Sequence, residues 1–147
     1  MKKTFQNIYV VLTYRNSDDL IDFIKSVKKN DSKSHIIVVN SFFDEESKKI
    51  IQQISINYKC DFINVENKGY SFGNNQGIDF AIKNYNFEFL IVSNADIIIN
   101  KFETSLLDNN SIHCCNIITK SGKNQNPMMV KQNRFSQFLI YKGLKKI

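Results

Sequence analysis

The stretch FINVENKGYSFGNNQGIDFAIKNYNFEFLIVSNAD, residues 62–96, contains one complete strand–helix–strand unit. Residues 62–65 and 89–92 are short apolar runs, typical of parallel strands that are covered on both faces. Between them, an opening rich in glycine is followed by the i, i+3, i+4, i+7 spacing of a helix face, formed by Ile78, Ala81, Ile82 and Tyr85. Because the crossover between parallel strands is right-handed and covers the sheet, this unit predicts an α/β protein.

The sequence before this unit repeats the same alternation. Residues 8–13 and 36–39 are further apolar runs that we expect to form strands. The first intervening helix has Ser17 as its expected N-cap, and its apolar face is formed by Leu20, Phe23, Ile24 and Val27. The second opens at the acids 44–46, and its apolar face is formed by Ile50, Ile51, Ile54 and Tyr58. The order β-α-β-α-β-α-β predicts a mainly parallel sheet between two layers of helices.

Composition excludes several other classes of protein. The chain has 147 residues, of which 42% are hydrophobic, and only five Gly and one Pro, so it is neither disordered nor collagen-like and favours one domain. Its apolar runs are far shorter than the about 20 residues that span a bilayer, and no small-residue cleavage site follows the basic start, so we expect a cytoplasmic protein. The chain has three cysteines, Cys60, Cys114 and Cys115, and no C-x-x-C pair. We therefore expect reduced thiols in the core and neither a disulfide framework nor a zinc site.

Positive charge is concentrated toward the C-terminus. Residues 1–100 hold 12 Lys and Arg against 12 Asp and Glu, whereas residues 101–147 hold eight against two. A segregated basic end favours an anionic partner such as phospholipid head groups or a phosphorylated substrate, and the alternative is a general bias toward lysine. Residues 134–147 are predicted to form a basic amphipathic helix, which either lies on an anionic membrane surface or packs against its own domain or another subunit.

Polar residues follow each predicted strand, at 13–16, 40–41, 66–69 and 93–96. The carboxyl ends of parallel strands meet at one rim of the sheet, where ligands of such folds bind. Each set alone is explained by strand ends and helix caps, but the four together indicate a ligand site. Asp96 is the candidate metal ligand, since Mg²⁺ or Mn²⁺ takes oxygen ligands and is often completed by substrate phosphates. The alternative is that Asp96 caps a turn.

Three glycines, Gly69, Gly73 and Gly77, recur every four residues. This spacing matches neither the dinucleotide fingerprint nor the phosphate loop. Gly69 is expected to turn the chain. Gly73 and Gly77 fall on one helical face, where the missing side chains allow close approach by either a sheet or a ligand.

These segments together resemble the donor-binding half of the family 2 inverting glycosyltransferases of the GT-A fold. The matching stretches, in order, are VVLTYRN at 10–16, IIVVNS at 36–41, ENKGYSFGNNQGI at 66–78 and SNAD at 93–96. The chain is most similar to the rhamnosyltransferase-like branch, whose members carry Asn-x-Gly-(Tyr/Phe)-x-x-Gly-x-Asn-x-Gly and a degenerate Asp-x-Asp motif. The resemblance covers about residues 6–100. It implies a Rossmann-like three-layer sandwich that binds nucleotide sugar.

The resemblance also implies roles for individual residues. Thr13 and Tyr14 would lie beside the base and ribose, and Asn40 stands where the family usually has a base-reading Asp. The wall near the diphosphate and sugar would be formed by Asn67, Gly69, Gly73 and Asn75. Asp96 would bind Mg²⁺ or Mn²⁺, with Asn94 in the place of the first carboxylate of the Asp-x-Asp motif. Donor and metal are therefore expected to bind together.

The implied reaction transfers a sugar, with inversion, from a nucleoside diphosphate to a glycan or lipid-linked acceptor in surface polysaccharide synthesis. The cation would neutralise charge on the departing diphosphate, and a general base would activate the acceptor hydroxyl. That base lies downstream of the metal motif in the family. Beyond Asp96 this chain has only Glu103 and Asp108, neither in a matching motif, so the catalytic base is unknown. His113 is more plausible as a strand residue than as a base.

The expected organisation is one domain with three parts. Residues 1–110 form the nucleotide-sugar-binding core, residues 111–133 begin an abbreviated acceptor region in which 111–118 form a further strand, and residues 134–147 are the basic helix. Family members are usually longer, so three interpretations of this chain stay open: a truncated product, a naturally short form, or a half that depends on a partner. We expect a cytoplasmic enzyme, and the alternative placement is peripheral contact with the inner face of the membrane. No nucleic acid partner is expected.

Two alternative functions stay open. A non-catalytic nucleotide-sugar-binding or interaction module would keep the donor cleft and lack the base. A receiver-like signalling domain would share the β-α alternation, but the sequence has no acidic pair after the first strand.

Overall fold

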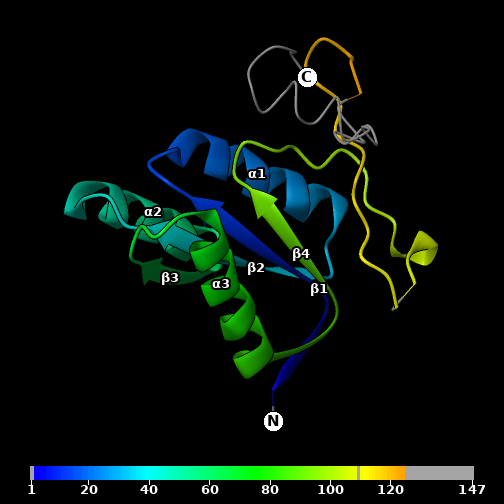
Figure 1. Ribbon diagram of the computed structural model, residues 1–147, viewed down its shortest axis with the longest axis horizontal. Coiled ribbons are helices and arrows are strands. Elements are labelled where there is room, and N and C mark those ends of the chain that lie inside the picture. Colours follow the sequence, from blue (N-terminus) through cyan, green and yellow to red (C-terminus); the bar gives the residue numbers. More distant parts are fainter. Residues whose placement is uncertain (1, 109, 125–147) are drawn as a thin grey trace, which may run out of the picture. The chain divides into compact units, whose positions relative to one another are not determined.

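The computed structural model describes residues 2–108 and 110–124. Its sheet has four strands, β1 (Lys3–Thr13), β2 (Ser34–Ser41), β3 (Asp61–Val65) and β4 (Tyr85–Asn94). All pairs are parallel and the order is β3-β2-β1-β4, as Figure 1 shows. This order is that of a Rossmann-like sheet, and it excludes the receiver-like order 2-1-3-4-5.

Two helices, α1 (Ser17–Asn30) and α2 (Glu45–Asn57), cover one face of the sheet. The predicted apolar face of α1 is confirmed, since its four residues Leu20, Phe23, Ile24 and Val27 are all buried. In α2, Ile51 and Ile54 are buried, whereas Ile50 is exposed. The N-cap of α1 is Asn16, one residue before the expected Ser17, and α2 is capped by Asp44.

The third helix, α3 (Tyr70–Asn84), covers the opposite face (Figure 1). Its buried residues are Gly73, Gly77 and Ala81, so small side chains at i, i+4, i+8 form the face toward the sheet. A Cβ on Gly77 would lie 2.7 Å from Val39 Cγ2, and it would also overlap Val10. Both glycines therefore serve close helix–sheet packing. Ile82, expected on the apolar face, is exposed.

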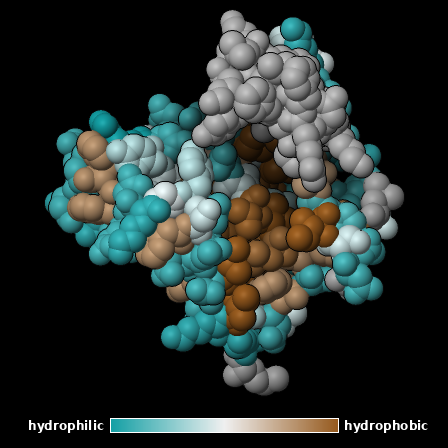
Figure 2. All heavy atoms as spheres, viewed as in Figure 1, coloured by the Kyte–Doolittle hydropathy of each residue, from teal (hydrophilic) through white to brown (hydrophobic). Residues whose placement is uncertain are grey.

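β4 is an edge strand. Among the described strands it pairs with β1 alone. Val92, on β4, is 45% exposed, and Figure 2 shows apolar side chains gathered over this side of the sheet. The chain after β4 returns to the α1 face, where Asn30 donates to the carbonyl of Ile99 at 2.7 Å and Ser26 Oγ accepts from the N–H of Ile99 at 3.0 Å. The 3₁₀ turn η1 (Thr104–Leu106) follows.

The chain divides into two compact units, residues 1–109 and residues 110–147. The described part of the second unit has no regular helix or strand. It holds a turn in which the N–H of Thr119 donates to the carbonyl of Lys123 at 2.9 Å, beside an isolated antiparallel bridge between Ile118 and Asn124. The predicted helix at 134–147 lies outside the described residues.

Two expectations are wrong. Residues 111–118 do not form a strand, since their backbone pairs with no strand among residues 2–108 and 110–124 apart from an isolated bridge at Ile118. His113 therefore lies in an irregular segment. None of the three cysteines forms a disulfide, but only Cys60 packs against the core, whereas Cys114 and Cys115 are exposed. Both errors arise because strand pairing and burial depend on tertiary contacts that a short run of residues does not encode.

In the part of the chain that the structure describes, no helix combines the length and apolarity needed to cross a membrane.

Candidate functional site

A cavity of about 350 Å³ lies at the carboxyl ends of the strands, within the first unit. It falls between β1 and β4, where the strand order reverses, which is the place at which open α/β sheets bind ligands. Its lining consists of Leu12, Thr13, Tyr14, Asn16, Ser41, Asn67, Gly69, Tyr70, Asn94, Ala95 and Asp96. Residues from all four predicted polar sets therefore meet in one cavity.

The loop after β1 is held by its own side chains. Asn16 Oδ1 accepts a hydrogen bond from Thr13 Oγ1 at 2.7 Å and one from the N–H of Tyr14 at 3.0 Å. Thr13 is buried, whereas the Tyr14 ring is exposed beside the cavity. Because the Asn16 side chain accepts these hydrogen bonds from the residues that precede it, it does not cap α1. The loop is thereby fixed with Tyr14 presented to a ligand.

The N-terminus of α3 forms another wall of the cavity through Gly69 and Tyr70. Gly69 has φ 91°, in the left-handed region that favours glycine, and it turns the chain into the helix as expected. No side chain caps α3, and its first turn holds no acid. The free N–H groups and the positive end of the helix dipole therefore favour an anion at this wall.

Asn94 and Asp96 come from the turn after β4. Ala95 between them is buried in the α1-face core, so it anchors the turn while its two polar neighbours remain exposed. Leu12 of β1 pairs with Asn94 of β4, which brings this turn beside the loop after β1. Asp96 supplies the only carboxylate among the residues that line the cavity.

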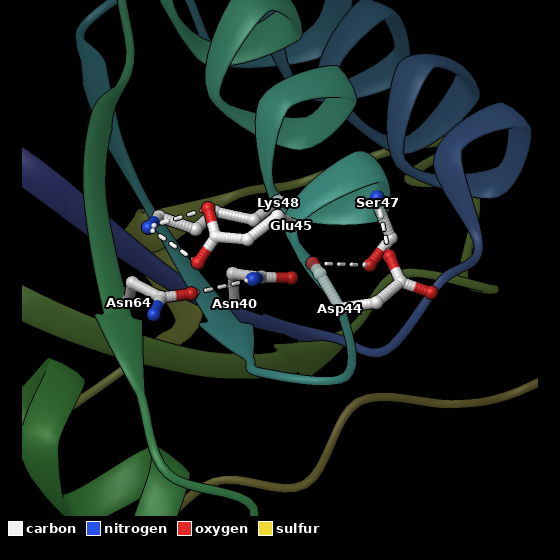
Figure 3. A network of polar contacts seen from close by, with 6 residues as sticks. All are labelled: Asn40, Asp44, Glu45, Ser47, Lys48 and Asn64. Carbon is white, nitrogen blue, oxygen red and sulfur yellow. Dashed lines mark hydrogen bonds and ion pairs between the residues drawn. The ribbon is translucent and has the colours of Figure 1, made fainter.

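Asn40 lies away from the cavity lining. It is buried beneath the start of α2, and its Nδ2 donates to Asn64 Oδ1 at 2.7 Å across β2 and β3. Figure 3 shows the two amides facing each other, with the Asn40 oxygen pointing away from Asn64. Close by, Asp44 Oδ1 accepts from the N–H of Ser47 at 2.7 Å, so the pair lies next to a capped helix start.

Gly73 and Asn75 also lie outside the cavity lining. A Cβ on Gly73 would come within 2.5 Å of Leu12 Cδ1, so Gly73 faces the sheet, and Asn75 is exposed on α3. Sequence reasoning did not assign a role to Asn16, Ser41 and Tyr70, which do line the cavity. Ser41 and Tyr70 stand next to assigned residues, and Asn16 stands two residues after Tyr14. The polar segments therefore predicted the place of the site but not the orientation of single side chains.

The residues present suit a cation that is shared with a ligand. Among the described residues, no cluster of three or more His, Cys, Asp and Glu side chains could hold a metal. Asp96 and the amide of Asn94 nevertheless offer oxygen atoms to the same cavity that the uncapped start of α3 lines. Mg²⁺ and Mn²⁺ readily accept such a site when phosphate oxygens complete the coordination.

The fold is similar to that of a solved mannosyltransferase, PcManGT from Pyrobaculum calidifontis, in complex with GDP-Man and Mn²⁺. The two chains are 15% identical, the TM-score is 0.50, and the match covers 65% of this chain and 30% of that one. This chain has the GT-A fold. It spans about 30% of the mannosyltransferase's length.

Two structures of TarS from S. aureus are also similar. The structure of TarS 1–349 is 18% identical, with a TM-score of 0.48 and coverage of 62% of this chain and 27% of that one. A second TarS structure is 21% identical, with a TM-score of 0.43 and coverage of 62% and 16%. No family model matches the chain, and no curated protein sequence is significantly similar to it.

Proposed function

We propose that this chain binds a nucleoside-diphosphate sugar together with Mg²⁺ or Mn²⁺ and acts as the donor-binding part of a family 2 inverting glycosyltransferase, of the rhamnosyltransferase-like branch. The observation that carries the proposal is the cavity at the β1–β4 switch point, which Asp96 and Asn94 line together with the uncapped N-terminus of α3. This pairing of a carboxylate with free N–H groups suits a diphosphate and its cation. The fold shared with a mannosyltransferase bound to GDP-Man and Mn²⁺ supports it.

In this proposal each wall of the cavity has a separate task. Thr13 and Tyr14 contact the ribose and base, with Asn40 behind them as a buried support for the loop after β2. Asn67 and Gly69 approach the diphosphate and sugar, with Gly73 and Asn75 positioning α3. Asp96 and Asn94 hold the cation. The cation, when bound, would neutralise the negative charge that develops on the departing diphosphate.

The acceptor is proposed to be a glycan or a lipid-linked sugar in surface polysaccharide synthesis. Contact with an anionic membrane through residues 134–147, and an acceptor region at 111–133, belong to the same proposal.

A non-catalytic donor-binding module is the second candidate, and one observation favours it. Asp96 is the only carboxylate lining the cavity, and if it holds the cation, no acid of the lining is left to act as general base. Glu103 instead pairs with Lys101 at 2.9 Å. Turnover separates the two candidates, because the enzyme would hydrolyse or transfer the donor sugar in the presence of metal and the module would not.

The test is calorimetric binding of a panel of nucleoside diphosphates and nucleotide sugars, with and without Mn²⁺. We expect one nucleotide to bind only with the metal, and Asp96→Ala to weaken that binding at least about tenfold, a loss of about 1.4 kcal/mol. Asp79→Ala is the matched control, since it removes an exposed carboxylate on α3 outside the cavity. Binding that survives in Asp96→Ala, or no binding of any nucleotide by the folded wild type, contradicts the proposal.

A further inference from the structure

The loop between β3 and α3 carries a lysine at the edge of the cavity. Asn67 and Gly69 both line the cavity, and Lys68 stands between them. The N–H of Lys68 donates to the carbonyl of Glu66 at 2.9 Å, so the backbone turns tightly at this point. Because neighbouring Cα atoms are about 3.8 Å apart, the Lys68 backbone lies beside the cavity wall.

Two contacts hold the Lys68 side chain away from the cavity lining. Its Nζ pairs with the carboxylate of Glu66 and lies 5.3 Å from the centroid of the Phe72 ring, in a cation–π contact. The hydrogen bond from Lys68 is the main reason why the pKa of Glu66 lies below its ordinary value of 4.5. Glu66 is therefore charged near neutral pH, and the contact is a full ion pair.

This ion pair is exposed and therefore easily exchanged for another. The side chains of Lys68 and Glu66 are 60% and 73% exposed, so water screens both charges, and holding two flexible side chains together costs entropy. A phosphate oxygen in a partly enclosed cavity is a stronger acceptor for an ammonium group than a carboxylate in water is. Because lysine has a flexible four-carbon stem, Lys68 can release Glu66 and turn toward an anion beside it.

The cavity itself offers no side-chain cation to a diphosphate. The residues described along its wall include no lysine, arginine or histidine, and Asp96 adds a negative charge. One divalent cation shared with Asp96 leaves part of the charge of a diphosphate unneutralised, and the start of α3 contributes only the partial charge of a helix dipole. A lysine between two residues of the wall can supply the positive charge that is missing.

We propose that Lys68 binds the diphosphate of the donor, and that Glu66 competes with the diphosphate for Lys68. This inference rests on the proposed function, because it needs a diphosphate in the cavity that Asp96 lines. Without ligand, Lys68 pairs with Glu66; with the diphosphate bound, its Nζ donates to a phosphate oxygen. The two residues therefore affect binding in opposite directions, and Glu66 acts only through Lys68.

The experiment measures binding of inorganic pyrophosphate with Mn²⁺ by calorimetry, for Lys68→Gln, Glu66→Gln and the double variant. We expect Lys68→Gln to weaken binding about tenfold, as loss of a hydrogen bond to a charged group does. Glu66→Gln should strengthen binding about two- to fivefold, because Lys68 no longer leaves a partner. The matched control is Lys101→Gln, since Lys101 pairs with Glu103 at 2.9 Å and neither residue lines the cavity.

The double variant separates competition from a general effect of charge. In it, Glu66→Gln should add nothing to the effect of Lys68→Gln. If Glu66→Gln strengthens binding equally with and without Lys68, Glu66 acts by its own repulsion of the anion, and the proposal is overturned. Unchanged affinity in either single variant also overturns it and leaves the donor site standing. If the folded wild type binds neither pyrophosphate nor any nucleotide, or if Asp96→Ala binds pyrophosphate as wild type does, the proposed function fails, and the role of Lys68 fails with it.

Discussion

Cys60 shows how burial of one residue controls its chemistry. Its thiol packs against the core and donates a weak hydrogen bond to the carbonyl of Tyr58 at 3.6 Å. Burial raises the pKa of Cys60 to about 11 from an ordinary value of 9.0. Because the thiolate is the reactive form, Cys60 should be inert in the native protein.

We therefore expect a thiol reagent at pH 8 to label the exposed Cys114 and Cys115 rapidly and Cys60 at least about a hundredfold more slowly, in line with its smaller thiolate fraction. Mass spectrometry of peptides after timed labelling measures the three rates. Unfolding in guanidinium should bring Cys60 to the same rate as the other two, which serves as the internal control. Equal rates in the native protein would show that Cys60 is not buried.

Residues of the site differ in how far the sequence could predict their place. The four polar sets were predictable, because strand ends of a parallel sheet meet at one rim and the carboxylate of Asp96 directly follows a strand. The position of the Asn40 side chain was not predictable, because its orientation depends on a hydrogen bond to Asn64 on another strand.

At the scale of elements, the face of α3 that packs against the sheet consists of residues with little or no side chain. Gly77 faces Val10 and Val39, whose β-branched side chains have little rotamer freedom, whereas Gly73 faces the end of the longer Leu12 side chain. The space at Gly77 is therefore harder to enlarge than the space at Gly73.

Gly77→Ala should lower the free energy of unfolding by about 1 to 3 kcal/mol, because an added methyl group overpacks the α3–sheet contact. Gly73→Ala should cost less, since a Leu12 methyl group can move aside. Urea denaturation measures both. The control is Gln76→Ala on the exposed side of α3, which should be neutral or slightly stabilising. A Gly77→Ala protein as stable as wild type would mean that α3 does not approach the sheet so closely.

Helices and strands were predictable to different extents. The strands extend further than their apolar runs, as in β4, which begins at Tyr85 and not at residue 89, because pairing with β1 continues through polar residues. The helix α1 followed its periodicity closely. In α3 the same periodicity placed Ile82 on the buried face, but the glycines, which carry no hydrophobic signal, define that face.

At the scale of the whole sheet, a polar cluster ties the amino ends of three strands together. Asp61 of β3 accepts hydrogen bonds from His35 of β2 at 3.0 Å and from Tyr85 of β4 at 2.5 Å. Phe5 of β1 stacks on His35 with ring centroids 4.7 Å apart, so all four strands contribute. The cluster lies at the opposite ends of the strands from the candidate site.

The charge state of this cluster follows from its contacts. Burial alone would raise the pKa of Asp61, but the hydrogen bonds from His35 and Tyr85 outweigh burial and hold that pKa below its ordinary value of 3.8. Burial, together with the bond to Asp61, raises the pKa of Tyr85 to about 12. Near neutral pH the carboxylate is therefore charged and the phenol neutral.

Because the pKa of Asp61 is lower in the folded state, its contribution to stability is present above the unfolded value of about 3.9 and is lost as the pH falls through the folded value. Asp61→Asn should reduce the free energy of unfolding at pH 7 by about 1 kcal/mol, and the gap to wild type should narrow as the pH falls below about 4. Urea denaturation from pH 7 down to roughly pH 2.5 measures the stability difference between the two proteins.

The control for this series is Asp22→Asn, which removes an exposed carboxylate on α1. Its stability should follow wild type at every pH. A gap between Asp61→Asn and wild type that stays constant down to the lowest pH would show that the carboxylate is not what the cluster depends on.

The edge strand β4 has a consequence for how the protein behaves in concentrated solution. In the described chain its outer N–H and C=O groups meet no further strand, and Val92 lies exposed on its surface. An open edge of this kind is a template on which another extended chain can add main-chain hydrogen bonds. Self-association should therefore start at β4, and Val92→Lys, which places a charge on this edge, is the change that should suppress it.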